Sequence, residues 1–237
     1  MSASRARMLA RIRAGLAQRG PWLADEAARA EHAPPPFVHP AQADVAEQFV
    51  AELTRLAGHV HRCADDVAAL DVLAALLEQH AAAELIAWEL PQIGLPDVDA
   101  LLAARGVAVL GGQIVGAGRA GALQRLDSAP VCISGADIAI AESGTLVLRG
   151  GPGRARLASL LAPVHIAVLR RDQIVRGLGE ALGLLRQRYG PDIFADSSSL
   201  TLISGPSRTG DIEQRLVLGV HGPNTVHVIL IDAAPAA

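Results

Sequence analysis

The chain has 237 residues, a formal net charge of −3 and 51% hydrophobic residues. A near-balanced charge gives no basic surface of the kind that binds nucleic acid, and no uncharged apolar run reaches the roughly 18 residues of a membrane helix. We therefore expect no nucleic acid partner and no membrane span. Because no secretory signal is readable at the N-terminus, we expect a cytoplasmic protein.

The sequence contains no lysine. Schiff-base chemistry and a Walker-type phosphate lysine are therefore excluded, and cationic roles fall to arginine and histidine. Cys63 and Cys132 are the only cysteines and lie far apart in the sequence. With no CxxC pair, we predict no iron–sulfur cluster and no metal site held by this chain, and expect both cysteines to be buried as small apolar residues.

The N-terminal residues form an arm ahead of the core. Apolar residues recur at helical spacing among arginines in residues 4–19, which predicts an amphipathic helix that Gly20 and Pro21 end. Residues 33–37 are proline-rich and predict an extended linker. We assign residues 1–40 to the arm and residues 41–237 to an α/β core domain. The arm is expected to lie on the core or on a partner chain.

In the first part of the core, strands and helices alternate. Helical patterns at residues 45–56, 66–80 and 97–104 alternate with strand patterns at residues 58–62, 84–88 and 106–110, and Asp97 is a plausible helix cap. This alternation predicts a mainly parallel central sheet covered on both faces.

Shorter strands follow after residue 120. We predict strands at residues 131–134, 138–141 and 145–149, with a tight turn at residues 142–144 in which Gly144 takes a positive φ. Helices are predicted at residues 154–161 and 178–189. The remaining predicted strands are residues 165–169, 200–203 and 226–231.

One polar motif reads SGPSRTGDIE at residues 204–213 and is followed by VHGP at residues 220–223. Its hydroxyls and the forked guanidinium of an arginine suit a carboxylate or phosphate ligand, more so if Thr209 caps a helix that starts near Asp211. The alternative is a turn with its arginine paired to an acid of the same loop, and both interpretations stay open. The candidate ligand-binding residues are Ser207, Arg208, Thr209, Asp211, Glu213 and His221.

A second polar motif reads GADIAIAESGT at residues 135–145. Glu142, on a glycine turn at the end of a strand, is a candidate base or nucleophile, and Asp137 is a candidate for binding a ligand hydroxyl or for capping a turn. Gly144 and Thr145 are predicted to contribute to the same ligand site. The alternative is a hairpin with a solvated glutamate.

The histidines give weaker signals. His227 falls inside a predicted strand and is expected to be packed in the core. His59 and His61 share one strand face, as a metal pair would need, but no third ligand is close in sequence.

The runs at residues 135–145, 205–213 and 218–223 resemble the LUD-domain family, and the length and N-terminal helix resemble its lactate utilization protein C (LutC/YkgG) branch. Gly210 stands where an alanine is expected. The resemblance implies a three-layer α/β/α fold of the CoA-transferase and ribose-5-phosphate isomerase kind. Members of that wider fold use a glutamate as nucleophile or acidic residues as bases on sugar phosphates, which makes Glu142 and Asp137 the candidate catalytic residues here. It also implies a role in oxidising L-lactate to pyruvate with two companion proteins that carry the iron–sulfur clusters.

Three hypotheses for the function follow. In the first, the chain is the subunit without iron–sulfur clusters in an L-lactate-oxidising system and binds a small anionic ligand. In the second, it is a stand-alone CoA-transferase-like or sugar-phosphate enzyme that uses Glu142. In the third, it is a regulatory or scaffold protein that binds a ligand without chemistry. The identity of any nucleotide-like ligand and the oligomeric state, a homo-oligomer included, stay open.

Overall fold

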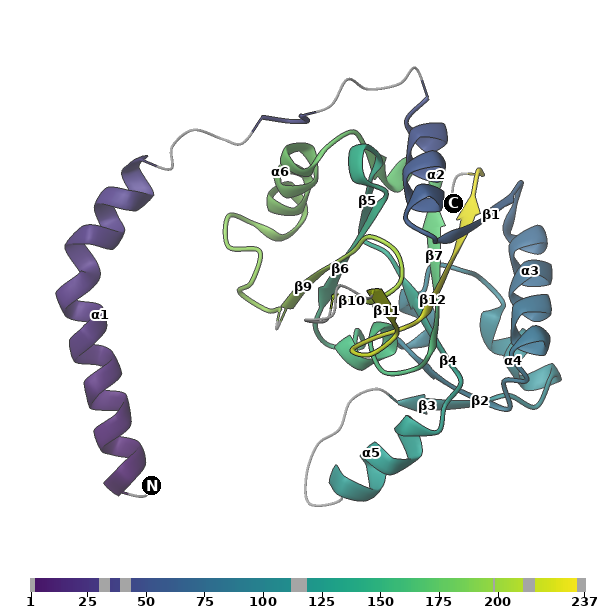
Figure 1. The fold of residues 1–237 in the computed structure, drawn as a ribbon, viewed down its shortest axis with the longest axis horizontal. Coiled ribbons are helices and arrows are strands. Elements are labelled where there is room, and N and C mark those ends of the chain that lie inside the picture. Colours follow the sequence, from purple (N-terminus) through teal and green to yellow (C-terminus); the bar gives the residue numbers. More distant parts are fainter. Residues whose placement is uncertain are drawn as a thin grey trace. The chain divides into compact units, whose positions relative to one another are not determined.

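The computed structural model describes residues 3–29, 35–38, 44–111, 119–197, 199–210 and 216–233. The chain divides into two compact units, Met1–Pro35 and Pro36–Ala237. In the first unit, helix α1 covers Ala3–Arg29 and contains Pro21 (Figure 1). Our prediction that the helix ends at Gly20 and Pro21 is wrong. A proline removes one helical hydrogen bond, and the alanines that follow favour continuation of the helix.

The centre of the second unit is a six-stranded, wholly parallel sheet in the order β1-β12-β7-β4-β2-β3. The strands are β1 (His59–Cys63), β2 (Glu84–Ala87), β3 (Ala108–Gly111), β4 (Val131–Gly135), β7 (Val164–Arg170) and β12 (Thr225–Ile231). Every residue of β4 and β7 is buried, as expected for central strands covered on both faces. The predicted parallel sheet is confirmed, and the carboxyl ends of all six strands lie at one edge.

Helices pack around this sheet. Helix α3 (Asp66–Gln79) contacts β12 and β1, and α4 (Val98–Ala104) contacts α3. Helix α2 (Val45–Arg55) contacts β1 and the short strand β8 (Ile174–Val175). Helix α5 (Arg119–Asp127) precedes β4. None of the helices within the described residues is long and apolar enough to cross a membrane.

Side-chain caps define two of the helix starts. Asp44 accepts from the backbone N–H groups of Ala46 and Glu47 at the start of α2, and Asp65 accepts from Ala68 N at the start of α3. Asp97 precedes α4 with a φ of 58° and makes no side-chain capping bond, so its predicted role as a cap is wrong. A residue that caps a helix through its side chain typically has extended backbone angles, which this left-handed conformation lacks.

A second, smaller sheet has the order β8-β5-β6-β9. Strands β5 (Ile138–Ile140), β6 (Thr145–Gly150) and β9 (Ser199–Ile203) are antiparallel neighbours, and helix α6 (Leu178–Tyr189) packs on β5. Together they enclose a separate apolar cluster of Ile138, Ile140, Val147, Ala181 and Leu185. A two-stranded ribbon, β10 (Arg208–Gly210) with β11 (Leu216–Leu218), follows.

Two predictions in this region need correction. The prediction of a helix at residues 154–161 is wrong, because the structure has only a single 3-10 turn, Arg156–Ser159. Arg154 is bridged to Gly151 in the preceding turn and so does not begin a helix, and Pro163 disfavours helical backbone in the residue before it. Thr209 lies in strand β10, paired with Val217, and is therefore not the cap of a helix. The residues where that helix would begin lie outside the described part of the chain.

The turn between β5 and β6 is confirmed. Gly144 has a φ of 56°, and a Cβ atom placed on it would lie 2.4 Å from the backbone nitrogen of Leu53 in α2. Only glycine satisfies both the left-handed conformation and this contact. The loop at Gly144 therefore packs the C-terminal part of α2 directly against the smaller sheet.

Gly144→Ala should lower the free energy of unfolding by at least ~2 kcal/mol, because it combines a strained φ with a backbone clash. The matched control is Gly183→Ala in α6, where nothing lies within 4 Å of the added carbon and φ is helical. That change should raise stability by about 0.5–1 kcal/mol. Urea unfolding of the two variants measures both changes in the free energy of unfolding. Equal effects of Gly144→Ala and Gly183→Ala would contradict the requirement for glycine at position 144.

His165 on β7 should make the fold sensitive to acid. It is wholly buried, its Nε2 lies 2.8 Å from Ser134 Oγ, and its Nδ1 has no hydrogen-bond partner within the described structure. Burial lowers the pKa of this imidazole from 6.5 to about 4. The unfolded chain therefore binds the proton first as the pH falls, and stability present above pH 6.5 declines towards pH 4. By pH 5 the loss is about 2 kcal/mol.

The measurement is the free energy of unfolding between pH 7 and pH 5. His165→Gln should make this dependence shallower without abolishing it, because burial and then the neighbouring histidines also lower the pKa of His227 to about 4. An unaltered slope in His165→Gln would rule out His165 as the source.

Candidate functional site

A cavity of about 340 Å³ lies at the carboxyl edge of the main sheet. Its walls come from the residues that follow three parallel strands, with Trp88 after β2, Asp137 after β4 and Arg170 at the end of β7, and from the last turn of α6. Ligands of α/β proteins typically bind at this edge. The charged residues in its lining are Asp137, Arg154, Arg170, Asp172 and Arg188.

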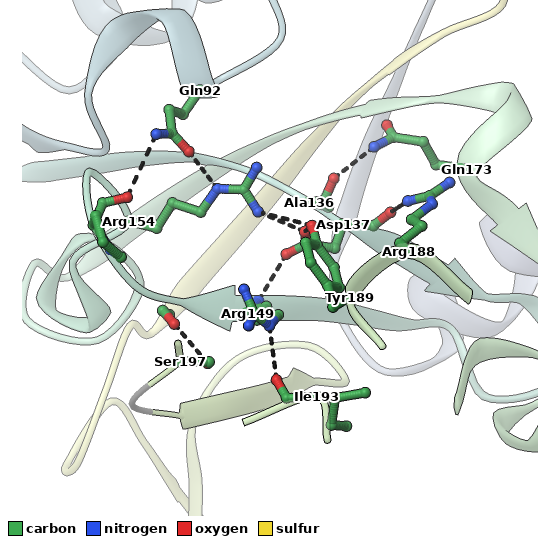
Figure 2. Close-up of polar contacts among 12 residues, drawn as sticks. Gln92, Ala136, Asp137, Arg149, Arg154, Gln173, Arg188, Tyr189, Ile193 and Ser197 are labelled. Atoms are coloured by element: carbon green, nitrogen blue, oxygen red, sulfur yellow. Dashed lines mark hydrogen bonds and ion pairs between the residues drawn. The ribbon is translucent and has the colours of Figure 1, made fainter. Parts of the chain in front are cut away.

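Asp137 is the centre of the polar network (Figure 2). Its side chain is only 2% exposed. Oδ1 accepts hydrogen bonds from Arg154 Nη1 at 2.6 Å and Tyr189 OH at 2.9 Å, and Oδ2 accepts from the backbone N–H of Arg149 at 2.7 Å. A carboxylate whose oxygens already accept from three donors is poorly placed to act as a nucleophile. Asp137 is therefore a positioning residue that holds Arg154 and Tyr189 at the cavity.

Arg154 provides a fixed positive charge. Its Nε donates to Gln92 Oε1, and its guanidinium carbon lies 5.2 Å from the centre of the Trp88 ring. Burial alone lowers the pKa of Arg154, but the Asp137 carboxylate and the Tyr189 hydroxyl outweigh it and raise that pKa above its ordinary value. The guanidinium thus stays charged, and its orientation is set from three sides.

Tyr189 is held in a similar way. The Arg149 guanidinium lies 4.1 Å from the centre of its ring, and Arg149 in turn donates to the Ile193 carbonyl and the Asp196 carboxylate. Burial and then the charge of Asp137 raise the pKa of the Tyr189 phenol. Tyr189 is consequently a hydrogen-bond donor throughout the physiological range.

The other two arginines of the cavity differ in how many of their N–H groups remain available to a ligand. Arg170 donates to Asp66 at 2.6 Å and to the carbonyls of Gly94 and Ala233, so its guanidinium is used within the fold. Arg188 is exposed, and its Nη1 donates to the Asp137 carbonyl at 2.9 Å, a contact that uses one of its five N–H groups. Arg188 is therefore the arginine best able to take an anionic ligand beside Arg154.

A family model, the LUD domain, matches residues 46–231. The chain belongs to the LUD domain family. Proteins named lactate utilization protein C are similar to it, among them those of Shouchella clausii (37% identity over 110 residues, 46% of this chain and 47% of that one) and Halalkalibacterium halodurans (30% over 161 residues, 66% of each). In most of these alignments the chain spans about half the length of the curated relatives it matches.

One solved structure supports the fold. A DUF162 family protein from Deinococcus radiodurans superposes with a TM-score of 0.56 at 22% identity, covering 79% of this chain and 96% of that one. At this level of identity the likeness shows the fold alone. Both the family and the mainly parallel α/β fold expected from the motifs are thus confirmed.

The LUD domain does not gather the predicted site residues at the cavity. Of those that the structure describes, Asp137 alone belongs to its lining. Glu142 accepts hydrogen bonds from Leu178 N at 3.1 Å through Oε1 and from Val38 N at 2.7 Å through Oε2. Its carboxylate thus lies at the N-terminus of α6, where the helix dipole favours an anion, and holds residues 36–38 against the core. These contacts favour an anchoring role over a role as base or nucleophile.

The two motifs do meet, but around the end of α2. Thr145 Oγ1 lies 2.6 Å from Ser204 Oγ, so the start of β6 and the end of β9 are joined by hydroxyls. A Cβ atom on Gly205 would lie 2.6 Å from the Leu56 carbonyl oxygen, and Arg208 donates to that same oxygen. The guanidinium predicted to bind an anion therefore caps the C-terminus of α2.

The remaining predicted residues belong to the neighbouring loops. Ser207 N donates to the Pro223 carbonyl and the Ser207 carbonyl accepts from Gly219 N, and His221 is exposed in the same loop. Asp211 and Glu213 lie outside the described residues. His227, predicted to be packed, is 5% exposed, with its Nδ1 3.0 Å from His61 Nε2. Within the described chain, no group of three or more histidine, cysteine or acidic residues is arranged to hold a metal.

Sequence reasoning missed Arg154, Arg188 and Tyr189. Arg188 and Tyr189 lie in helix α6, and charged residues in a helix usually indicate a face that is exposed to solvent. A usable signal existed for Arg154, because it ends the turn Gly151-Pro152-Gly153 that follows the buried strand β6. A polar residue on a tight turn after a buried strand was the criterion applied to Glu142, and it applies equally there.

Glu142→Gln should loosen the contact between residues 36–38 and α6, because a neutral amide oxygen accepts more weakly than a carboxylate and loses the attraction to the helix dipole. We expect faster amide hydrogen exchange at Val38 and Leu178 and a loss of about 1–2 kcal/mol in stability. The control is Glu180→Gln, whose carboxylate accepts from Arg176 N in the same region. It should leave exchange at Val38 unchanged. Protected exchange at Val38 in Glu142→Gln would contradict the anchoring role.

Proposed function

We propose that the cavity around Asp137 binds a small carboxylate, and that this LUD domain is the subunit without iron–sulfur clusters in a system that oxidises L-lactate to pyruvate. The observation that carries the proposal is the pairing of Arg154, oriented by a buried carboxylate, with the exposed Arg188 at one cavity. A guanidinium presents forked donors that match a carboxylate, and both lactate and pyruvate carry one.

The assignment to lactate use is supported by the relatives named lactate utilization protein C. The oxidation step and the assembly are part of the proposal. The two cysteines of this chain are buried, and burial raises the pKa of Cys132 to about 12, so neither is suited to ligate a cluster as a thiolate. In the proposal, two companion proteins carry the iron–sulfur clusters, and this chain supplies a binding site.

The contacts in the cavity favour binding over covalent chemistry by this chain alone. The oxygens of Asp137 accept from Arg154, Tyr189 and a backbone amide, and those of Glu142 accept from backbone amides. Neither carboxylate is arranged as a nucleophile. The charges of Arg154 and Arg188 instead form a preorganised receptor for an anion, which loses little entropy on binding. The Tyr189 hydroxyl donates its one hydrogen to Asp137 and so helps to hold this arrangement.

Calorimetric titration with pyruvate and L-lactate tests the binding site. Arg188→Gln should weaken binding 10- to 100-fold, since a charge-assisted contact in a partly enclosed site is lost. Arg186→Gln, on the same helix but not in the cavity lining, is the matched control and should bind as the unaltered chain does. Equal affinity in all three proteins would overturn the carboxylate site.

A genetic experiment tests the pathway assignment separately. Deletion of the gene should abolish growth on L-lactate and spare growth on pyruvate, and the unaltered chain should restore it where Arg188→Gln does not. Normal growth of the deletion strain on L-lactate would overturn the role in lactate oxidation.

A further inference from the structure

The lining of the cavity includes the carboxylate of Asp172, which lies after β7 in the 3-10 turn Arg171–Gln173. Within the described residues, no hydrogen bond or ion pair involves this carboxylate. We propose that Asp172 accepts a hydrogen bond from the 2-hydroxyl group of an L-lactate whose carboxylate binds Arg188, so that the site prefers a 2-hydroxy acid over the corresponding 2-oxo acid. The proposal rests on the proposed function, and it deepens that function by naming the residue that distinguishes substrate from product.

The residues on either side of Asp172 hold its turn in place. Gln173 accepts from Arg170 N at 2.7 Å through Oε1 and donates to the Ala136 carbonyl at 2.6 Å through Nε2. Arg171 donates to two carboxylates, one at the start of α2 and one after β12. The position of Asp172 is thus fixed before a ligand binds, which lowers the entropy cost of binding.

The same contacts bring Asp172 to the side of the cavity where Arg188 lies. Gln173 and Arg188 donate to consecutive carbonyls after β4, those of Ala136 and Asp137 (Figure 2). Since Asp172 directly precedes Gln173 and shares the cavity lining with Arg188, its carboxylate and the Arg188 guanidinium border the same part of the cavity. Both residues are exposed to solvent, so a ligand can reach them.

The charges of the lining favour a ligand that carries both a carboxylate and a hydrogen-bond donor. Arg154 is paired with Asp137 at 2.6 Å, and Arg170 is paired with the first residue of α3 at 2.6 Å. Arg188 and Asp172 are the cation and the anion of the lining that have no charged partner within the described chain. A ligand that places a carboxylate at the arginine and a donor at the aspartate satisfies both groups.

The group on carbon 2 decides which acid meets this requirement. The hydroxyl of L-lactate donates to a carboxylate, whereas the carbonyl oxygen of pyruvate can only accept, and two acceptors repel each other. A carboxylate that faces the pyruvate oxygen is left without a donor, and such an unmatched polar group lowers affinity. Pyruvate therefore still binds through its carboxylate, but more weakly than L-lactate. A 2-amino acid also carries a donor on carbon 2, and L-alanine is accordingly part of the test.

Calorimetric titration of the full chain with L-lactate, pyruvate and L-alanine compares three acids of equal length that differ in the group on carbon 2. We expect L-lactate to bind at least about tenfold more tightly than pyruvate, because only the hydroxyl gains a hydrogen bond to a charged acceptor. Asp172→Asn should bring the two dissociation constants within about threefold of each other, because an amide can accept from the hydroxyl and donate to the carbonyl. The substitution should not disturb folding, since Asp172 is exposed.

The matched control is Glu180→Gln. It removes a carboxylate from the first turn of α6, the helix that carries Arg188 in its last turn, but Glu180 does not belong to the cavity lining. The preference for L-lactate over pyruvate should be unchanged in this variant. A preference that is lost in Glu180→Gln as well would attribute it to the overall charge of the region and overturn the role of Asp172.

The remaining outcomes separate this proposal from the proposed function. Equal affinity for L-lactate and pyruvate, or a preference for L-lactate that survives in Asp172→Asn, would overturn the role of Asp172, while binding that depends on Arg188 upholds the carboxylate site. No binding of either acid, or binding that Arg188→Gln does not weaken, would overturn the proposed function and the role of Asp172 with it. Tightest binding of L-alanine, reduced by Asp172→Asn, would assign the cavity to a 2-amino acid and overturn both.

Discussion

The buried carboxylate of Asp137 joins the parts of the molecule that make the cavity. It follows the main-sheet strand β4 and accepts from the backbone of β6 in the smaller sheet, from Tyr189 at the end of α6 and from Arg154 in the turn after β6. A charge removed from water is costly unless donors surround it, so each of these elements is drawn to one point. The same requirement leaves Arg154 held at the edge of a cavity, charged and oriented before any ligand arrives.

Close backbone approaches give the cavity walls their rigidity. A Cβ atom on Gly135 would lie 2.8 Å from the Ile93 carbonyl oxygen, so the loop after β2 presses directly on the end of β4. Gly153 allows the same loop to meet the turn that carries Arg154. Such contacts have little freedom to adjust, because a side chain at either glycine would have to displace backbone or a neighbouring polar group. The site is therefore a product of main-chain packing as much as of the polar side chains that line it.

The sequence predicts the main sheet well because its strands and helices alternate, and it places Asp137 in a polar motif directly after a buried strand. It does not predict the partners of Asp137, which lie 17 and 52 positions away in a turn and in a helix. Glu142 shows the converse difficulty. A carboxylate on a glycine turn has the pattern of an exposed base, and nothing local reveals that residues 36–38 and the start of α6 close over it. The partners of Asp137 and those of Glu142 are both set by tertiary contacts between segments that no local sequence pattern connects.

The register of a short antiparallel pair links the fold to the site. Pairing of Ile138 with Val147 brings the Asp137 N–H to the Val147 carbonyl at 2.9 Å and the Arg149 N–H to the Asp137 carboxylate. A slip of one residue would exchange side chains between the two apolar clusters on the opposite faces of this sheet and place a different backbone group before Asp137. The turn at Gly144, seated on α2, sets the loop length that fixes this register. The turn at Gly144 thus controls the orientation of Arg154 without lining the cavity, because it determines which amide meets the carboxylate that holds that arginine.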